Sequence, residues 1–236
     1  MINSYISIDL ETTGLNPKTD KIIEIGAIKV RDGQIQDTFS ALINPGRKLE
    51  TRITELTGIT DDMLLGASTV EEELPSLLSF LEELPLLGHR VLFDYSFLKK
   101  AAVNCRFPFE KAGIDTLKIA RRYLTDAEHK NLEYLCRYYG IEHRAHRALG
   151  DAIATHELFQ RLLRDFGQED AIFLPQKLNY QVKREAPITK PQRERLYRLL
   201  EQHKIDIGVC VDSLTRSEAD RIIDRIRAGA YRPAGS

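Results

Sequence analysis

YISIDLETTGL, residues 5–15, places two carboxylates two positions apart within an apolar run that is typical of a β-strand. Side chains alternate along a strand, so Asp9 and Glu11 share one face with Tyr5 and Ser7, roughly 7 Å apart. The apolar residues between them take the other face. Two like charges at this separation repel unless a cation lies between them. A solvated strand edge is the alternative explanation, and this stretch alone does not decide between the two.

The segments around this stretch change from strands to helices along the chain. Three strands are expected at 4–10, 21–31 and 34–43, after which the apolar period becomes helical. Short apolar pieces near 84–88 and 112–115 fit two further strands between the helices. This order predicts an α/β fold in which helices cover both faces of a mixed sheet. The helices are expected at 70–82, 93–104, 116–124, 131–139 and 149–166.

The C-terminal part of the chain has a different organisation. Residues 1–166 are expected to form the first domain, and the fading periodicity over 167–185 indicates a linker. Beyond it, Thr189 and Thr215 each begin a capping-box pattern followed by a helical apolar stripe. Residues 186–232 are therefore expected to form a small helical domain, an appendage of roughly 45 residues near the size limit for independent folding.

The charges of the chain are unevenly distributed. From residue 175 onward there are 13 Lys or Arg and 8 Asp or Glu, whereas the first 174 residues hold 21 and 27. A basic tail favours a phosphate-rich partner, although two solvated surfaces that simply differ explain the counts equally well.

The cellular environment is indicated by what the sequence lacks. The three cysteines are widely separated, without disulfide or metal-site spacing. No secretory signal pattern or membrane-length apolar run is present. We therefore expect a cytoplasmic protein with no membrane partner.

Two further acids lie on the apolar faces of predicted helices. Asp94 shares its stripe with Phe97, and Asp151 shares one with Leu158. An acid in a first helical turn often only complements the helix dipole, and for Asp94 this explanation stays open. A carboxylate on a core-facing stripe is costly unless it is paired or binds a metal. We expect a functional role for Asp151 in particular.

Four acids on separate segments, without a cluster of His or Cys, would form an all-oxygen site. Such a site suits Mg²⁺ or Mn²⁺ better than Zn²⁺. Two ions about 4 Å apart serve phosphoryl chemistry, because they activate the attacking water and stabilise the leaving oxygen. The pattern therefore indicates a metal-dependent reaction at a phosphate ester.

This chemistry needs a group that accepts the proton of the water. His146 lies five residues before Asp151, and five helical residues turn about 500°, so His146 must lie on the loop that enters the helix. Its usual pKa near 6.5 suits a general base. A histidine between Arg144 and Arg147 is more often a surface residue, and the spacing to Asp151 is what favours function.

Three motifs, in this order, resemble the DnaQ-like 3′–5′ exonucleases of the DEDDh type: IDLETTGL (8–15), GHRVLFDYSFL (88–98) and HRALGD (146–151). The resemblance covers about residues 3–166. Within the family, this segment is similar to the proofreading branch, which includes DNA polymerase III epsilon subunits. It implies an RNase H-like fold. It also implies that two Mg²⁺ or Mn²⁺ ions are held by four acids and that a histidine is the general base. These residues are Asp9, Glu11, Asp94 and Asp151 for the metal, and His146 for the base.

The same resemblance implies a set of substrate contacts. Thr12 would lie near the terminal nucleotide, Leu15 would wedge against the final bases, and Thr57 would line the 3′ end of the strand. His89 would either contact the substrate or be a structural histidine. The sequence departs from the family at Arg90, where the family often carries asparagine, and this could alter contacts to the nucleic-acid backbone.

These interpretations predict an enzyme that releases nucleoside 5′-monophosphates from the 3′ end of single-stranded DNA, in proofreading, repair or DNA processing. An RNA-trimming exonuclease of the same family is an alternative, because no residue decides the sugar. A catalytically silent nucleic-acid-binding scaffold is a third hypothesis, against which the complete set of acids and the histidine argues. A DNA polymerase or another DNA-processing protein is the expected partner of the C-terminal helices, and a solvated helical hairpin that docks on the exonuclease domain is an equal alternative.

Overall fold

The computed structural model of this chain describes residues 2–143, 145–167 and 170–229. The chain divides into two compact units. The first comprises Met1–Pro45 and Leu49–Val182, and the second comprises Gly46–Lys48 and Lys183–Ser236.

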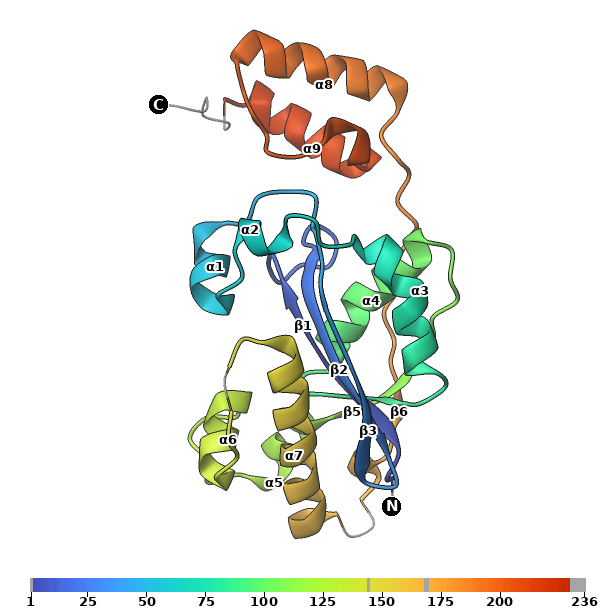
Figure 1. Ribbon diagram of the computed structural model, residues 1–236, viewed down its shortest axis with the longest axis vertical. Coiled ribbons are helices and arrows are strands. Elements are labelled where there is room, and N and C mark those ends of the chain that lie inside the picture. The colour runs from blue at the N-terminus through green and yellow to red at the C-terminus, as the bar shows by residue number, and fades with distance from the viewer. Residues whose placement is uncertain (1, 144, 168–169, 230–236) are drawn as a thin grey trace. The chain divides into compact units, whose positions relative to one another are not determined.

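A six-stranded mixed sheet with the order β3-β2-β1-β4-β5-β6 forms the centre of the first unit (Figure 1). The strand β1 pairs antiparallel with β2 and parallel with β4. It therefore lies inside the sheet, with a hydrogen-bonded neighbour on each side. The strands are β1 (Tyr5–Thr12), β2 (Ile22–Arg31), β3 (Gln34–Leu42), β4 (Leu86–Gly88), β5 (Ala112–Asp115) and β6 (Gln176–Lys177).

Helices cover both faces of this sheet (Figure 1). Helices α3 and α4 pack on one face against Ile6, Ile8 and Leu10, and α5, α6 and α7 pack on the other face with Tyr5. The predicted α/β architecture is confirmed. These helices are α3 (Val70–Leu81), α4 (Leu92–Asn104), α5 (Thr116–Tyr123), α6 (Leu132–Tyr139) and α7 (Ala148–Phe166).

Side chains of β1 alternate between the two faces of the sheet, and this directs Asp9 and Glu11 toward α7. Ser7 Oγ donates a hydrogen bond of 2.7 Å to the carbonyl of Ala152 in α7. Since Asp9 and Glu11 have the same parity as Ser7, they lie on the face that α7 covers. The strand also runs to Thr12, two residues beyond its predicted end, so both acids are inside the paired region. The alternative of a solvated strand edge is wrong.

Part of the segment 167–185, which we expected to be a linker, is folded onto the first unit. Phe173 in the 3-10 helix η1 (Ala171–Phe173) is buried in the core beneath α5–α7, and β6 pairs antiparallel with β5. Helices α1 (Thr51–Thr57) and α2 (Asp61–Leu64) were likewise not predicted. Elements this short do not establish an apolar period, which is why the sequence pattern missed them.

The second unit contains two helices, α8 (Lys190–His203) and α9 (Arg216–Arg227), with a 3-10 turn η2 (Val211–Ser213) between them. The two expected capping boxes are present, at Thr189 and Thr215. The helices share a small apolar core that includes Leu196 and Ile223. Among the residues that the structure describes, no helix is both long and apolar enough to span a bilayer.

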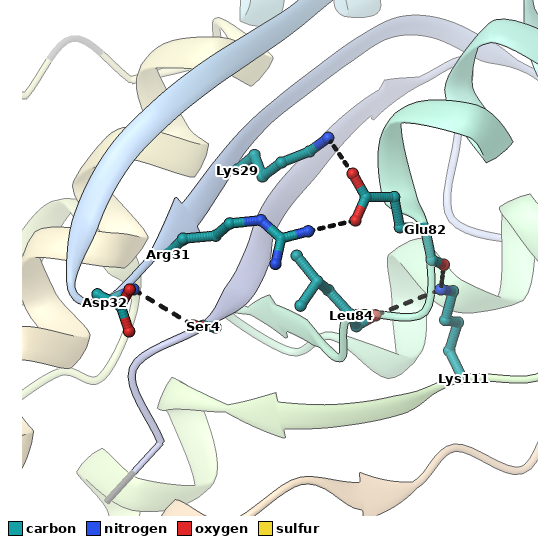
Figure 2. Close-up of polar contacts among 7 residues, drawn as sticks. All are labelled: Ser4, Lys29, Arg31, Asp32, Glu82, Leu84 and Lys111. Atoms are coloured by element: carbon teal, nitrogen blue, oxygen red, sulfur yellow. Dashed lines mark hydrogen bonds and ion pairs between the residues drawn. The ribbon is translucent and has the colours of Figure 1, made fainter.

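A polar cluster closes the turn after α3 (Figure 2). The Glu82 carboxylate binds Lys29 at 2.8 Å and also binds Arg31, both of which come from β2. Lys111 donates to the backbone carbonyls of Glu82 and Leu84. The hydrogen bond from Lys29 lowers the pKa of Glu82, so this acid is balanced by its neighbours. We call this set the Glu82 cluster.

Candidate active site

The structure brings the four predicted metal ligands to one end of β1. One carboxylate oxygen from each of Asp9, Glu11 and Asp151 lies within 4.8 Å of the others. Asp9 and Glu11 come from β1, and Asp151 comes from the first turn of α7. Asp94, in the first turn of α4, accepts a hydrogen bond of 3.1 Å from the backbone N–H of Leu10, between the two β1 acids.

Burial and mutual repulsion dominate the electrostatics of this carboxylate cluster. Burial raises the pKa of Glu11 to about 8, with further contributions from the charges of Asp151 and Glu24. Burial also raises the pKa of Asp94 to about 8 and the pKa of Asp9 well above its usual value. Groups that are this reluctant to ionise together favour a positive partner. An all-carboxylate donor set could hold a hard divalent cation such as Mg²⁺ or Mn²⁺.

His146 lies on the loop that enters α7, as its spacing from Asp151 predicted. Its backbone has a φ of 68°, in the left-handed region, and its N–H donates to Asp151 Oδ2 at 3.0 Å. This hydrogen bond fixes the position of the histidine relative to the acid. Its role as the general base stays a prediction.

A second histidine contacts the same acid, and sequence reasoning missed it. Nε2 of His143 is hydrogen-bonded to Asp151 Oδ1, and its side chain is only 5% exposed. Burial raises the pKa of Asp151, while the contact with His143 opposes that shift. The available signal was the repeated histidine in HRAHRALGD, three residues before His146.

The loop after β1 presents an apolar side chain on a constrained backbone. Thr12 Oγ1 donates to the carbonyl of Gly14 at 2.6 Å, and a Cβ at Gly14 would lie 2.6 Å from the Asp20 carboxylate. Asp20 also accepts from the N–H of Asn16 at 2.8 Å. Leu15, between these fixed points, is 78% exposed. The loop therefore presents the Leu15 side chain to solvent, directly after the strand that carries Asp9 and Glu11.

Thr57 and His89 are engaged within the protein. Thr57 is buried at the end of α1, where its hydroxyl donates to the carbonyl of Ile53 at 2.9 Å. His89 contacts Thr116 Oγ1 at 2.9 Å through Nδ1 and the carbonyl of Lys130 at 2.7 Å through Nε2. Both residues have structural contacts, and their substrate roles stay predictions.

The backbone at Arg90 lies in the left-handed region. Arg90 has a φ of 78°, and its N–H donates to Asp115 Oδ1 at 3.0 Å. Asparagine adopts the left-handed region more readily than other residues with a Cβ. Arg90 adopts this conformation here, and its guanidinium lies 5.9 Å from the ring centroid of Phe93.

Comparison with known proteins identifies the family. The model of the exonuclease family matches residues 6–159. The chain belongs to this exonuclease family. The DNA polymerase III epsilon subunit of Aquifex aeolicus is 36% identical over 164 residues, which cover 69% of this chain and 81% of that protein. The predicted membership of the DnaQ-like exonucleases is confirmed.

PolC-type DNA polymerases III are also similar to this exonuclease domain. The protein from Thermotoga petrophila is 40% identical over 164 residues, which cover 68% of this chain. The chain spans only 12% of the length of that polymerase. The likeness therefore concerns one part of a much longer protein.

Solved exonuclease structures share the fold. Exonuclease X in complex with 5′-overhanging duplex DNA has a TM-score of 0.56 and 25% identity, covering 69% of this chain and 93% of that one. The nuclease domain of 3′hExo, a DEDDh family member bound to rAMP, has a TM-score of 0.60 and 23% identity, covering 76% and 98%. The predicted RNase H-like fold of this exonuclease domain is confirmed.

Proposed function

We propose that the first unit is a divalent-metal-dependent 3′–5′ exonuclease that hydrolyses single-stranded DNA and releases nucleoside 5′-monophosphates. The observation that carries this proposal is the carboxylate cluster. Asp9, Glu11 and Asp151 offer oxygens within 4.8 Å of one another, in a chain of the exonuclease family. Asp94 completes the set through its hydrogen bond to the β1 backbone.

The four acids are the proposed metal ligands. Their oxygens are hard donors, which suit a hard divalent cation. The pKa values of Asp9, Glu11 and Asp94 are raised because their negative charges are buried close together, and a bound cation would offset this repulsion in place of protons. Two Mg²⁺ or Mn²⁺ ions bound there would supply Lewis-acid activation of the attacking water and stabilisation of the leaving oxygen. Asp9 and Glu11 are fixed by strand pairing, and Asp151 is fixed by the start of α7.

We assign His146 as the general base that accepts the proton of the water. Its backbone N–H holds it against Asp151, on the loop at the entrance of α7. An imidazole is neutral and able to accept a proton near pH 7. His143 contacts the opposite oxygen of Asp151, and we assign it the role of orienting that carboxylate.

The 3′ end of the substrate is placed on the Thr12–Leu15 loop. The exposed side chain of Leu15 offers an apolar surface for a terminal base, and the loop directly follows the strand that carries Asp9 and Glu11. DNA is favoured over RNA because the relatives with 36% and 40% identity are named DNA polymerase III subunit epsilon and DNA polymerase III PolC-type. RNA stays the second candidate, since the more distant 3′hExo domain was solved with rAMP.

We further propose that the second unit contacts a DNA polymerase or another DNA-processing protein. Its helices carry several exposed basic side chains, which would also allow contact with nucleic acid. A pull-down with the full chain and purified polymerase is the direct measurement, with DNase treatment to separate protein contacts from a DNA bridge. The exposed basic residues include Lys190, Arg198, Arg216, Arg221, Arg225 and Arg227.

The deciding experiment uses 3′-labelled single-stranded DNA and RNA, with and without Mg²⁺. Release of labelled mononucleotide from DNA only in the presence of Mg²⁺ is the expected result. Release from RNA alone would favour the exoribonuclease. Binding without degradation, with or without metal, would contradict the enzyme and favour the silent scaffold.

A further inference from the structure

Glu24 is a buried acid that has no part in the proposed metal binding or proton transfer. Its side chain is 2% exposed, and the β1–β2 register pairs it with Glu11. Burial of Glu24, a further acid beside the carboxylate cluster, adds negative charge where it is already excessive. Such a residue needs a strong compensating contact to be retained there.

The compensating contact comes from the start of α7. Arg147 donates to Glu24 Oε1 from Nη2 at 2.9 Å and from Nε at 3.1 Å. The backbone N–H of Ala148, the first residue of α7, donates to Oε2 at 2.9 Å. Glu24 thus binds the guanidinium and also supplies the anion that a helix N-terminus favours. The side chain of Arg147, the N-cap residue, makes no cap hydrogen bond of its own.

Gly26 lets the same helical turn rest directly on β2. A Cβ at Gly26 would lie 2.1 Å from the carbonyl carbon of Ala148 and 2.1 Å from the nitrogen of Leu149. Gly26 pairs with Asp9 in the β1–β2 register. The first turn of α7 is therefore placed beside the strand residues that carry the carboxylate cluster. Any other residue at this position would displace the helix.

Asp151 and His146 lie on either side, in sequence, of Arg147 and Ala148, the two residues that Glu24 binds. The N–H of Asp151 donates to the carbonyl of Arg147 at 3.0 Å, the first hydrogen bond of α7. His146 is the residue directly before Arg147. A shift of Arg147 would therefore move the acid and the histidine together.

We infer that Glu24 and Arg147 form a positioning pair, which fixes the first turn of α7 on β2 and thereby sets Asp151 and His146 against the acids of β1. The inference rests on the proposed function, and it assigns the pair a role through Asp151 and His146, without contact to the reacting atoms. Groups that orient metal ligands typically change metal affinity or activity by about 10–100-fold when they are removed.

The test compares Arg147→Met with Arg31→Met. Arg31 is a matched control because it is also an arginine that pairs with a glutamate beside β2. Arg31 lies on β2 and binds Glu82 (Figure 2), whereas Arg147 binds Glu24 of β2. Each variant of the full chain is measured by calorimetric titration with Mn²⁺, by kcat and KM on a short single-stranded oligonucleotide, and by thermal unfolding.

Arg147→Met is expected to weaken Mn²⁺ binding and to lower kcat, each by about 10–100-fold, with KM within about threefold of wild type. Arg31→Met is expected to leave the Mn²⁺ affinity and kcat within about twofold of wild type. Arg147→Lys keeps the charge without the planar fork and should fall between Arg147→Met and wild type. Glu24→Gln should reproduce the defect of Arg147→Met, and the double variant should be no worse than either single one.

Two results would overturn the inference. Unchanged Mn²⁺ affinity and kcat in Arg147→Met would remove the positioning role, and a rise in KM alone would make Arg147 a contact to substrate phosphates. Arg147→Lys carries the same test if the methionine variant does not fold. If wild type binds Mn²⁺ but degrades no nucleic acid, the proposed function fails, and the Mn²⁺ titrations still decide the inference.

Discussion

Two groups of charged side chains beside the central strands differ in how their charge is balanced. In the Glu82 cluster, one exposed carboxylate faces Lys29 and Arg31, and its pKa is lowered. In the carboxylate cluster, Asp9 and Glu11 face two further acids, and burial and repulsion raise their pKa values. One group is neutralised by its own chain, and we propose that the other receives a cation from solution.

The comparison shows how a structural charge differs from a functional one. An acid that stabilises the fold has its partner within the protein, so removing it costs stability and leaves chemistry unchanged. An acid that serves a metal site destabilises the fold while no metal is bound. Removing it should therefore raise the stability of the metal-free protein and abolish its chemistry.

Asp9→Asn should produce the largest effect on activity. Loss of one proposed ligand removes several kcal/mol of transition-state stabilisation, so kcat should fall by on the order of 10³-fold or more. The metal-free variant should unfold at a higher temperature than wild type, because one of the repelling charges is gone. Mononucleotide release and calorimetry in EDTA measure the two effects. Full activity, or a lower unfolding temperature, would contradict the assignment.

His146→Ala and His143→Ala should differ in size. Removal of a general base should lower kcat by about 10²–10⁴-fold, whereas removal of a group that orients Asp151 should cost about tenfold. The two variants are compared under saturating Mg²⁺ on the same oligonucleotide, with circular dichroism as a check of folding. A larger loss in His143→Ala would transfer the base role to His143.

The metal-free protein should lose thermal stability as the pH rises from about 5 to 8. The pKa values of Glu11 and Asp94 are about 8 in the folded chain, above their usual values of 4.5 and 3.8. The folded state therefore binds more protons than the unfolded state across this window, and stability falls as those protons are lost. Unfolding temperatures measured in EDTA should show the decline, and saturating Mg²⁺ should reduce it. An unchanged slope in Glu11→Gln would argue against the carboxylate cluster as its origin.

Glu82→Gln should have the smallest effect on activity. The variant loses two exposed ion pairs, which contribute little individually, so the unfolding temperature should fall only slightly. The values of kcat and KM should stay within about twofold of wild type, because the residue takes no part in the proposed chemistry. A marked loss of Mn²⁺ affinity would show that the two charged groups are coupled.

The sequence predicted the site because acids on apolar faces are conspicuous. Asp94 and Asp151 each interrupt an apolar helical stripe, and the structure places Asp151 beside Asp9 and Glu11 of β1. Glu24 interrupts β2 in the same way, yet its partner Arg147 lies 123 positions away, and no local pattern connects them. His143 was missed because its contact depends on how the loop before α7 is folded.

The limits of the fold prediction have a similar physical origin. Strand and helix periods locate elements that bury a whole face, such as β2 and α7. They do not find β6, whose two residues are exposed and pair antiparallel with β5. The extension of β1 to Thr12 was also missed, because the pairing with β2 continues past the point where the apolar alternation stops.

The fixed loop that carries Leu15 has a consequence for the entropy of binding. Gly14 packs against Asp20, and Asp20 and Asn16 take backbone hydrogen bonds within the loop, so Leu15 projects from a backbone that is already ordered. A base that packs against Leu15 would not have to order this loop first, which removes a common penalty of association. Successive nucleotides could then be engaged and released at a similar free-energy cost, as repeated removal of single residues from a strand end requires.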